Sequence, residues 1–238
     1  MPCGVLESDL DGRDPYYWQM ILWDPIQDSV IGGQRLLFVG EDQLMSGEAI
    51  DDCVSYLEHC YPGFAQTVLS AHHAFAEVGR TFVSPAYQGG VWLKELIRGF
   101  VRLPESRGIR RAFGLISFNH LATSKEATDV FLSALSRSLF RGDTLIPTPR
   151  YPYYPSDTPA NLFWDAFELT PLEIAIKNLD PSFSLPPVLR PYRSLCSVEY
   201  EGASLATSYN QVMQLLFSGK SELISRQQRR RLPAYPSF

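Results

Sequence analysis

The sequence predicts a single α/β domain, and three observations support this fold class. The stretch from His73 to Phe118 has the pattern of strand, tight turn, amphipathic helix and strand, which is the pattern of a βαβ unit. Other short apolar runs bounded by Pro, Gly and Asp are typical of strands. A chain of 238 residues, 45% hydrophobic and 20% charged, is long enough for one large core. We therefore treat residues 1–238 as one domain, with residues 225–238 as a flexible tail.

The N-terminal third is expected to form a hairpin followed by a helix. The aromatic run Tyr16–Trp23 predicts a strand, a turn follows at Asp24, and Val30–Val39 predicts the return strand. In Gly47–Cys60 the apolar residues lie on one helical stripe and the acidic residues elsewhere, which predicts an amphipathic helix packed on the sheet.

The central βαβ unit is the clearest element of the pattern. The helix after Gly90 has a wide apolar face and is expected to stop at Pro104. The apolar run Ala112–Phe118 predicts the next strand. Because a helix separates the two strands, we expect them to pair in parallel through a right-handed crossover.

The C-terminal half is expected to contain three more helices and two more strands around an irregular loop. Two capping boxes, TSKE and TPLE, predict helix starts. The expected segments are a helix from Thr123–Glu126 to about Phe140, a Pro- and Tyr-rich loop at Arg141–Pro159, a helix from Thr170 to about Leu179, a short helix after Leu185, and strands at Cys196–Tyr200 and Tyr209–Phe217.

Composition and charge exclude several classes of protein. The net charge of -5 gives no basic footprint for nucleic acid. The four cysteines are scattered, which favours reduced thiols in a cytoplasmic protein over a disulfide framework. The N-terminus lacks the pattern of a secretory signal, and no run of about 18 apolar residues is present. We therefore expect a cytoplasmic protein that contacts a membrane at most peripherally.

A metal site and a thiol nucleophile are not predicted. His59, Cys60, His72 and His73, with Cys53 upstream, fit no common zinc spacing. No sequence context marks any cysteine as an activated nucleophile.

The strand that opens the βαβ unit carries the candidate chemistry. Glu77 is a candidate general base, and Arg80 and Arg35 carry guanidinium groups suited to a carboxylate. Glu77 and Arg80 are three residues apart and would face opposite sides of a regular strand. A bulge at Gly79 would bring them together. The alternative is structural: an ion pair between Glu77 and Arg80, and a scaffold role for each arginine.

The turn before the helix is a candidate anion site. Gln88, Gly89 and Gly90 lie between Val83, at the end of the strand, and Val91, at the helix start. Backbone amides and the positive end of the helix dipole would face a phosphate there. A Gly pair before a helix also occurs in ordinary turns.

Four segments in this order resemble a known family: Trp23–Leu36, Glu77–Gly90, Phe113–Phe118 and Leu185–Leu195. With these four segments the chain resembles the hemolysin-like branch of the GNAT acyltransferase fold, which includes the ornithine-lipid and glycine-lipid synthases. It is more distantly similar to acyl-homoserine lactone synthases and long-chain N-acyl amino acid synthases. Gln88 stands where family members usually have Arg.

The resemblance implies a fold, a reaction and a site. The fold would be a mixed, mostly antiparallel sheet, splayed at two central parallel strands and flanked by helices. The reaction would move a fatty acyl group from an acyl carrier protein or CoA thioester to the amino group of an amino acid, with no permanently bound cofactor. Glu77 would be the catalytic base, and an amide near Gly79 the oxyanion hole. We expect Ser117 and Phe118 to line the substrate side.

Arginines near the central helix suggest a partner. An acidic acyl carrier protein would dock on a basic patch, although charged runs are more often solvated faces. The candidate residues are Arg98, Arg102, Arg107, Arg110 and Arg111, and the tail arginines Arg226, Arg229, Arg230 and Arg231 are candidates for contact with anionic lipid.

Two other functions fit parts of the pattern. An acyl-homoserine lactone type synthase would use S-adenosylmethionine as the acceptor. A non-catalytic protein that binds acyl thioesters or lipids on a degenerate GNAT scaffold is the second alternative, which the Gln88 substitution motivates. Turnover of a thioester separates an enzyme from a binding protein.

Overall fold

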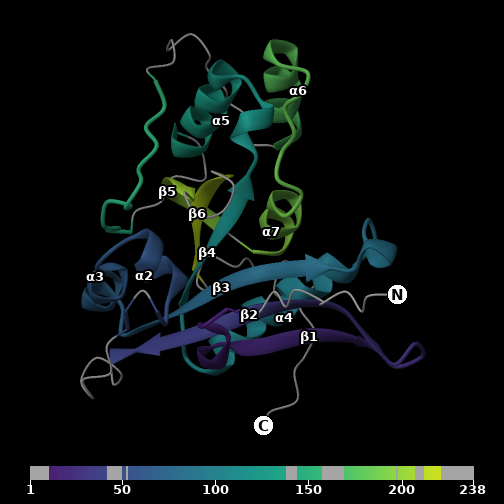
Figure 1. Ribbon diagram of the computed structural model, residues 1–238, viewed down its shortest axis with the longest axis vertical. Helices are drawn as coiled ribbons and strands as arrows, with labels where there is room; N and C mark the ends of the chain where they lie inside the picture. Colours follow the sequence, from purple (N-terminus) through teal and green to yellow (C-terminus); the bar gives the residue numbers. More distant parts are fainter. Residues whose placement is uncertain are drawn as a thin grey trace, which may run out of the picture.

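A computed structural model describes residues 11–41, 50–51, 53–137, 144–156, 169–196, 198–206 and 212–220. Its centre is a six-stranded sheet with the order β1-β2-β3-β4-β6-β5 (Figure 1). The strands are β1 (Trp18–Asp24), β2 (Ser29–Gly40), β3 (Ala74–Val83), β4 (Arg111–Phe118), β5 (Val198–Ala206) and β6 (Val212–Lys220).

Helices cover both faces of this sheet. One buried apolar cluster joins the sheet to α4, α5, α6 and α7, and a second cluster joins the other face to α2 and α3. The α-helices are α2 (Tyr56–Cys60), α3 (Phe64–Ala71), α4 (Trp92–Ser106), α5 (Lys125–Arg137), α6 (Leu169–Leu179) and α7 (Leu189–Leu195). Three short 3-10 helices are η1 (Asp14–Tyr16), η2 (Pro85–Tyr87) and η3 (His120–Ala122).

The expected fold class is confirmed. The neighbouring pairs of strands are antiparallel except β3 and β4, which pair in parallel. The parallel pairing spans only Ala76 to Val78 on β3 and Ala112 to Gly114 on β4. Beyond these residues the two strands part, and in Figure 1 their arrowheads point in clearly different directions. The sheet is therefore splayed at its central parallel pair.

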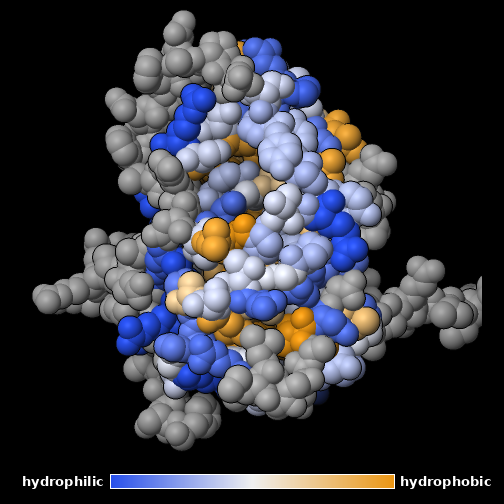
Figure 2. All heavy atoms as spheres, turned by 90° about the vertical axis from the view of Figure 1, so that its left-hand side faces the viewer, coloured by the Kyte–Doolittle hydropathy of each residue, from blue (hydrophilic) through white to orange (hydrophobic). Residues whose placement is uncertain are grey.

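The outer surface on the side of α2 and α3 is mostly polar. Figure 2 shows this side, with hydrophilic side chains over most of it and hydrophobic ones in small separate groups. The large apolar side chains of α3, such as Phe64 and Val68, are instead buried against the sheet. On this side the helices α2 and α3 form one layer and the sheet the other, with an apolar core between them.

Helix boundaries differ from expectation in three places. A helix was expected over Gly47–Cys60, and among the described residues of this segment only α2 is helical. Residues 42–49 and 52 lie outside the described part. The helix α3, which follows α2 closely, was not predicted. Gly63 has a φ of 84°, which Gly adopts readily, and it begins the new helix.

The third difference is at the end of α4, which was expected to stop at Pro104. This proline lies inside the last turn of α4, where its missing N–H removes one helix hydrogen bond. The amides of Arg107 and Ile109 donate to the Pro104 carbonyl and close the helix. Proline therefore marks the last turn here rather than the boundary.

The other predicted elements are present with small shifts. At the start of α5 the Ser124 hydroxyl, not Thr123, accepts a hydrogen bond, from the Ala127 amide. Thr170 lies within the first turn of α6 rather than before it. The predicted loop from Arg141 is irregular where it is described, from 144 to 156. The predicted tail at 225–238 lies outside the described residues.

Candidate active site

A large cleft opens where β3 and β4 part. It has a volume of about 1130 Å³. At its closed end Gly114 is required, because a Cβ there would lie 2.6 Å from Val78 Cγ1. The missing side chain lets the two strands approach at their last pair. The split then begins directly beyond Val78.

The lining of the cleft changes from polar to apolar. The polar part is lined by Asp11, Asp14, Arg35, Tyr56, Glu77, Arg80 and Gln214. The apolar part is lined by α4, α7, the strands beside them and residues next to the two helices, among them Phe100, Val101, Ile109, Ile116, Val188, Tyr192 and Phe217. Such a cleft has room for both a long apolar group and a polar one.

Glu77 is buried at the polar part of the cleft, with 3% of its surface exposed. Its Oε1 atom accepts hydrogen bonds from the Tyr17 hydroxyl at 2.6 Å and from the amides of Tyr56 and Leu57 at 3.1 and 3.3 Å. Its Oε2 atom accepts one, from the Ser55 hydroxyl at 2.6 Å. The carboxylate therefore lies against the first turn of α2 with four donors.

Burial is the largest influence on the protonation of Glu77 and raises its pKa. The hydrogen bonds from Ser55, Tyr17 and the two α2 amides lower the pKa but do not cancel the effect of burial. A carboxylate with a raised pKa is a stronger base than an exposed one. This protonation behaviour suits proton abstraction from an amine.

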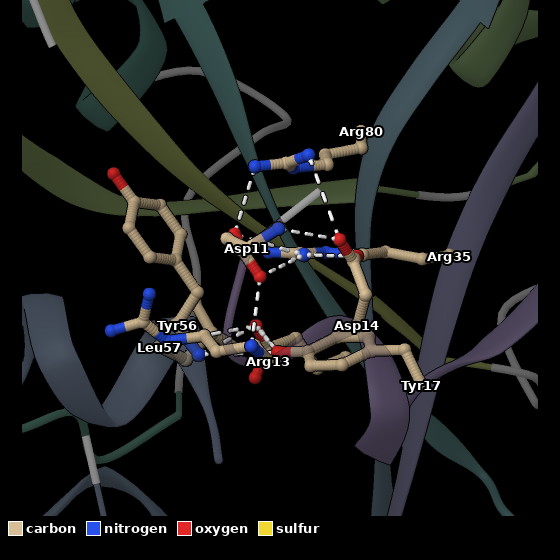
Figure 3. Close-up of polar contacts among 9 residues, drawn as sticks. Asp11, Arg13, Asp14, Tyr17, Arg35, Tyr56, Leu57 and Arg80 are labelled. Carbon is tan, nitrogen blue, oxygen red and sulfur yellow. Dashed lines mark hydrogen bonds and ion pairs between the residues drawn. The ribbon is translucent and has the colours of Figure 1, made fainter. Parts of the chain in front are cut away.

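Arg35 and Arg80 lie together, bound to two carboxylates of the chain itself (Figure 3). Arg35 Nη1 lies 3.1 Å from Asp11 Oδ1 and 2.9 Å from Asp14 Oδ1. Arg80 Nη2 lies 2.8 Å from Asp11 Oδ2. The Arg35 guanidinium also lies over the Tyr17 ring, 4.4 Å from its centroid, which links the arginine pair to the Glu77 network.

The predicted bulge is present, one residue beyond Gly79. The register between β2 and β3 shifts between Gly33 and Arg35, so that one residue of β2 faces two of β3. Arg80 has a φ of 48°, unusual for a residue other than Gly. The bulge turns the Arg80 side chain toward Asp11, which Arg35 also contacts. Gly79 pairs with Arg35 on β2 and lines the cleft. Glu77 and both arginines thus reach one network despite their spacing.

The predicted phosphate turn lies at the far end of β3. Gln88 Nε2 donates to the Val83 carbonyl at 3.0 Å, Gly89 has a φ of 80°, and Val91 is 57% exposed. Gly90 completes the turn before α4. These residues are not among those that line the cleft, so their role as a cofactor site stays a prediction.

The two predicted substrate-side residues on β4 face opposite ways. Ser117 lines the cleft. Phe118 does not: its ring contacts Phe131 and Phe183 in the core. Its predicted role on the substrate side stays a prediction.

The predicted basic patch is partly used within the chain. Arg98 forms an ion pair with Glu95, and Arg107 lies over the rings of Trp18 and Phe38 at 4.6 Å from each centroid. Arg111 is buried and lies 3.5 Å from Glu199. Arg110 is exposed.

The sequence did not point to Tyr17, Ser55, Asp11 or Asp14. Tyr17 was interpreted as part of a strand, although it precedes β1. Ser55 was within an expected helix, yet Ser55 and Glu58 have capping-box spacing, and the Ser55 hydroxyl accepts from the Glu58 amide at 3.0 Å. That spacing was the available signal for a helix start beside Glu77.

No group of three or more His, Cys, Asp or Glu side chains in the described ranges is arranged to hold a metal ion. Cys53, Cys60 and Cys196, the cysteines among the described residues, are not in disulfide bonds. None of the described helices has the length and apolar character needed to cross a membrane.

Comparison with known proteins agrees with the topology. A family model described as an acetyltransferase (GNAT) domain matches residues 4–98. The chain has the GNAT fold. The matched region includes β3 with its bulge and Glu77, and the turn before α4. The family match and the topology support an N-acyltransferase enzyme. No curated protein matches the sequence at a significant level.

The solved structures that match this chain are distant in sequence. One is a CoA-dependent acyl-homoserine lactone synthase, BjaI, with SAM and isopentyl-CoA (11% identity, TM-score 0.41, covering 94% of this chain and 66% of that chain). Another is an aminoglycoside 6'-N-acetyltransferase complexed with coenzyme A (10%, 0.39, 90% and 76%). A third is a CoA-dependent acyl-homoserine lactone synthase, MesI (14%, 0.41, 93% and 71%). The chain thus spans about two thirds of the length of the BjaI structure.

Proposed function

We propose that the protein is an N-acyltransferase that moves a fatty acyl group from a thioester donor to the amino group of an amino acid or amino-acid lipid. The observation that carries the proposal is the position of Glu77, a buried carboxylate on the wall of the cleft that opens between the parallel strands. The GNAT domain match over this same strand supports it.

In the proposed reaction the acceptor amine loses a proton to Glu77. Its nitrogen forms a bond to the thioester carbonyl carbon, the carbon–sulfur bond breaks, and the thiolate leaves and takes up the proton. Oε2 of Glu77 is the candidate acceptor atom, because it receives one hydrogen bond where Oε1 receives three. The backbone beside Gly79 and the Arg80 bulge is the candidate oxyanion site.

The donor and acceptor occupy different parts of the cleft in this proposal. The apolar part between α4, α7 and β4 takes the acyl chain, since its lining buries alkyl groups favourably. The polar part takes the acceptor. Delivery by an acyl carrier protein docked near Arg110, and membership of the ornithine-lipid synthase branch, are further parts of the proposal.

A binding protein without turnover is the second candidate. The observation that favours it is the state of Arg35 and Arg80, whose guanidinium groups are held by Asp11 and Asp14 rather than free for the carboxylate of an acceptor. An acyl thioester would then enter the cleft and stay intact.

One assay separates the candidates. Purified protein is mixed with acyl-CoA and acyl carrier protein thioesters of short, medium and long chains, with a panel of amino acids, S-adenosylmethionine, or no acceptor. Thiol release that requires an amino acid supports the proposed function. Release only with S-adenosylmethionine supports a homoserine-lactone type reaction. Tight binding without release supports the binding protein, and absence of both binding and release contradicts every candidate.

A further inference from the structure

We propose that Tyr17 and Ser55 are positioning residues that orient the Glu77 carboxylate and leave its Oε2 atom able to accept a proton from the acceptor. The inference rests on the proposed function, because it assigns the groups that prepare the base of that reaction. Neither residue belongs to β3, and each reaches Glu77 from a different element.

Tyr17 approaches Glu77 from the segment before β1. It is buried, and its hydroxyl lies 2.6 Å from Glu77 Oε1. Its ring lies beneath the Arg35 guanidinium, which is itself fixed by Asp11 and Asp14. The phenol is therefore held in place from both ends, and its hydroxyl has a fixed direction.

Ser55 approaches Glu77 from the N-cap of α2. Its hydroxyl lies 2.6 Å from Glu77 Oε2, and the residue is almost fully buried. The amides of Tyr56 and Leu57, in the first turn of the same helix, also donate to Glu77. The helix start thus presents three donors to one carboxylate.

The direction of the two hydroxyl protons follows from their other partners. The Tyr17 oxygen accepts from the Tyr56 amide at 3.1 Å, and the Ser55 oxygen accepts from the Glu58 amide at 3.0 Å. A hydroxyl that accepts from an amide still has its own proton to donate. Both hydroxyl protons therefore point to Glu77. With the two amide protons of α2, Glu77 then receives four hydrogen bonds. This arrangement matches an ionised carboxylate, which only accepts, rather than a protonated carboxyl, which would add a proton of its own.

The two hydroxyls oppose the effect of burial. Burial raises the pKa of Glu77, and the hydrogen bonds from Ser55 and Tyr17 are the largest influences that lower it. Other charged or titratable groups around this carboxylate are Tyr56 and Cys60 on α2, Arg35 on β2, and beyond it Asp11, Asp14 and Arg80. β4 contributes the apolar Phe113 opposite Glu77.

The test is the titration of Glu77 in a Tyr17→Phe variant, which keeps the ring beneath Arg35 and removes the hydroxyl. Carbon-13 NMR of labelled glutamate side chains, assigned with Glu77→Gln, follows the carboxylate directly. We expect the apparent pKa of Glu77 to rise by about one to two units, since a hydrogen bond to a charged group contributes roughly that much. The acid limb of kcat/KM should move upward by the same amount.

The matched control is Tyr61→Phe, which removes a hydroxyl from another buried tyrosine of the same apolar cluster. It should change neither the titration nor the pH profile. Ser55→Ala, with Ser204→Ala as the buried-serine control, tests the second hydroxyl if Tyr17→Phe does not fold. An unchanged titration of Glu77 in Tyr17→Phe or Ser55→Ala overturns the inference.

The titration needs no acyl transfer, so the two failures are distinguishable. If the wild-type protein transfers acyl groups but the titration does not move, the positioning role is wrong and the proposed function stands. If the titration moves but no thioester is consumed with any acceptor, the proposed function is wrong.

Discussion

The two halves of β3 are built differently, although they are one strand. From Ala74 to Val78 the strand is mostly buried and pairs with β2, and from Ala76 to Val78 it pairs with β4 as well. From Gly79 to Val83 it is half-buried or exposed, pairs only with β2, and contains the bulge at Arg80. The first half is a scaffold and the second borders a cleft. The candidate base, Glu77, lies just before this boundary.

At this boundary a side chain can be both rigidly held and next to open space, which is what a catalytic group needs. A group on the doubly paired half is held by hydrogen bonds on both sides and cannot easily move. A group on the singly paired half has space beside it for a ligand. Glu77 has the rigidity of the first half, and its carboxylate reaches the space opened by the second. Rigid placement of reactive groups is what transition-state stabilisation requires.

The largest expected effect is that of Glu77→Gln, which removes the candidate base at the boundary between the two halves of β3. Loss of the base should lower kcat for acyl transfer by about 10²–10⁴-fold. Thiol release measures the rate, and circular dichroism checks that the variant is folded. Because the pKa of Glu77 is raised by burial, wild-type activity should fall as pH drops through a value above the ordinary 4.5 for Glu, as the base becomes protonated. Full activity in Glu77→Gln would contradict its role.

The second prediction compares the arginines on either side of the bulge. Arg35 is 4% exposed, and Arg35→Met would leave Asp11 and Asp14 without their buried partner, at a cost of about 3–5 kcal/mol in the free energy of unfolding. The Arg80 side chain is 44% exposed, and Arg80→Met should cost less than about 1 kcal/mol. Urea denaturation measures both. Equal losses would show that the network is not centred on Arg35.

The third prediction concerns the last pair before the split. Gly114→Ala places a Cβ 2.6 Å from Val78 Cγ1 and 3.1 Å from the Val78 carbonyl oxygen, so the strands must separate. We expect a loss of about 1–3 kcal/mol in the free energy of unfolding. Gly89→Ala, at a turn with open space around it, is the comparison for a strained φ without a clash. If Gly114→Ala unfolds at the same temperature as the wild-type protein, the close approach of the two strands is refuted.

The smallest expected effect tests the turn at the far end of β3. If the turn holds the donor's phosphate, Gln88→Arg adds a cation there and lowers KM for acyl-CoA by up to about fivefold, as an exposed ion pair contributes less than about 1 kcal/mol. The effect should weaken at high salt. A KM that stays the same at low salt would place the phosphate elsewhere.

The sequence was sufficient for the fold because its strongest signals are local. The βαβ unit from His73 to Phe118 shows its strand and helix periods directly, and the parallel pairing follows from connection length. The place where the pairing ends, at the close approach of Val78 to Gly114, is not revealed by spacing. The sequence placed the bulge at Gly79, because glycine often marks an irregular strand, but the residue that adopts the positive φ is Arg80.

The site was only half predictable. Glu77 and Arg35 were identified by residue type and by resemblance. Tyr17 and Ser55 were not, because they meet Glu77 from sequence separations of 60 and 22 residues, and a hydroxyl in an aromatic run or at a helix cap carries no catalytic signal. Ser117 lines the cleft whereas Phe118 packs in the core, and residue type alone does not reveal this difference.

In the proposed function an acyl thioester occupies the cleft between β3 and β4. The most direct measurement is photocrosslinking with an acyl-CoA analogue that carries a diazirine near the end of its chain, followed by mass spectrometry. We expect labels on the apolar lining at α4, β4 and the start of α7, such as Val101, Ile116 and Val188, and we expect unlabelled acyl-CoA to compete for them. Competed labels confined to the exposed side chains of the β1–β2 hairpin, such as Trp23 and Ile26, would contradict it.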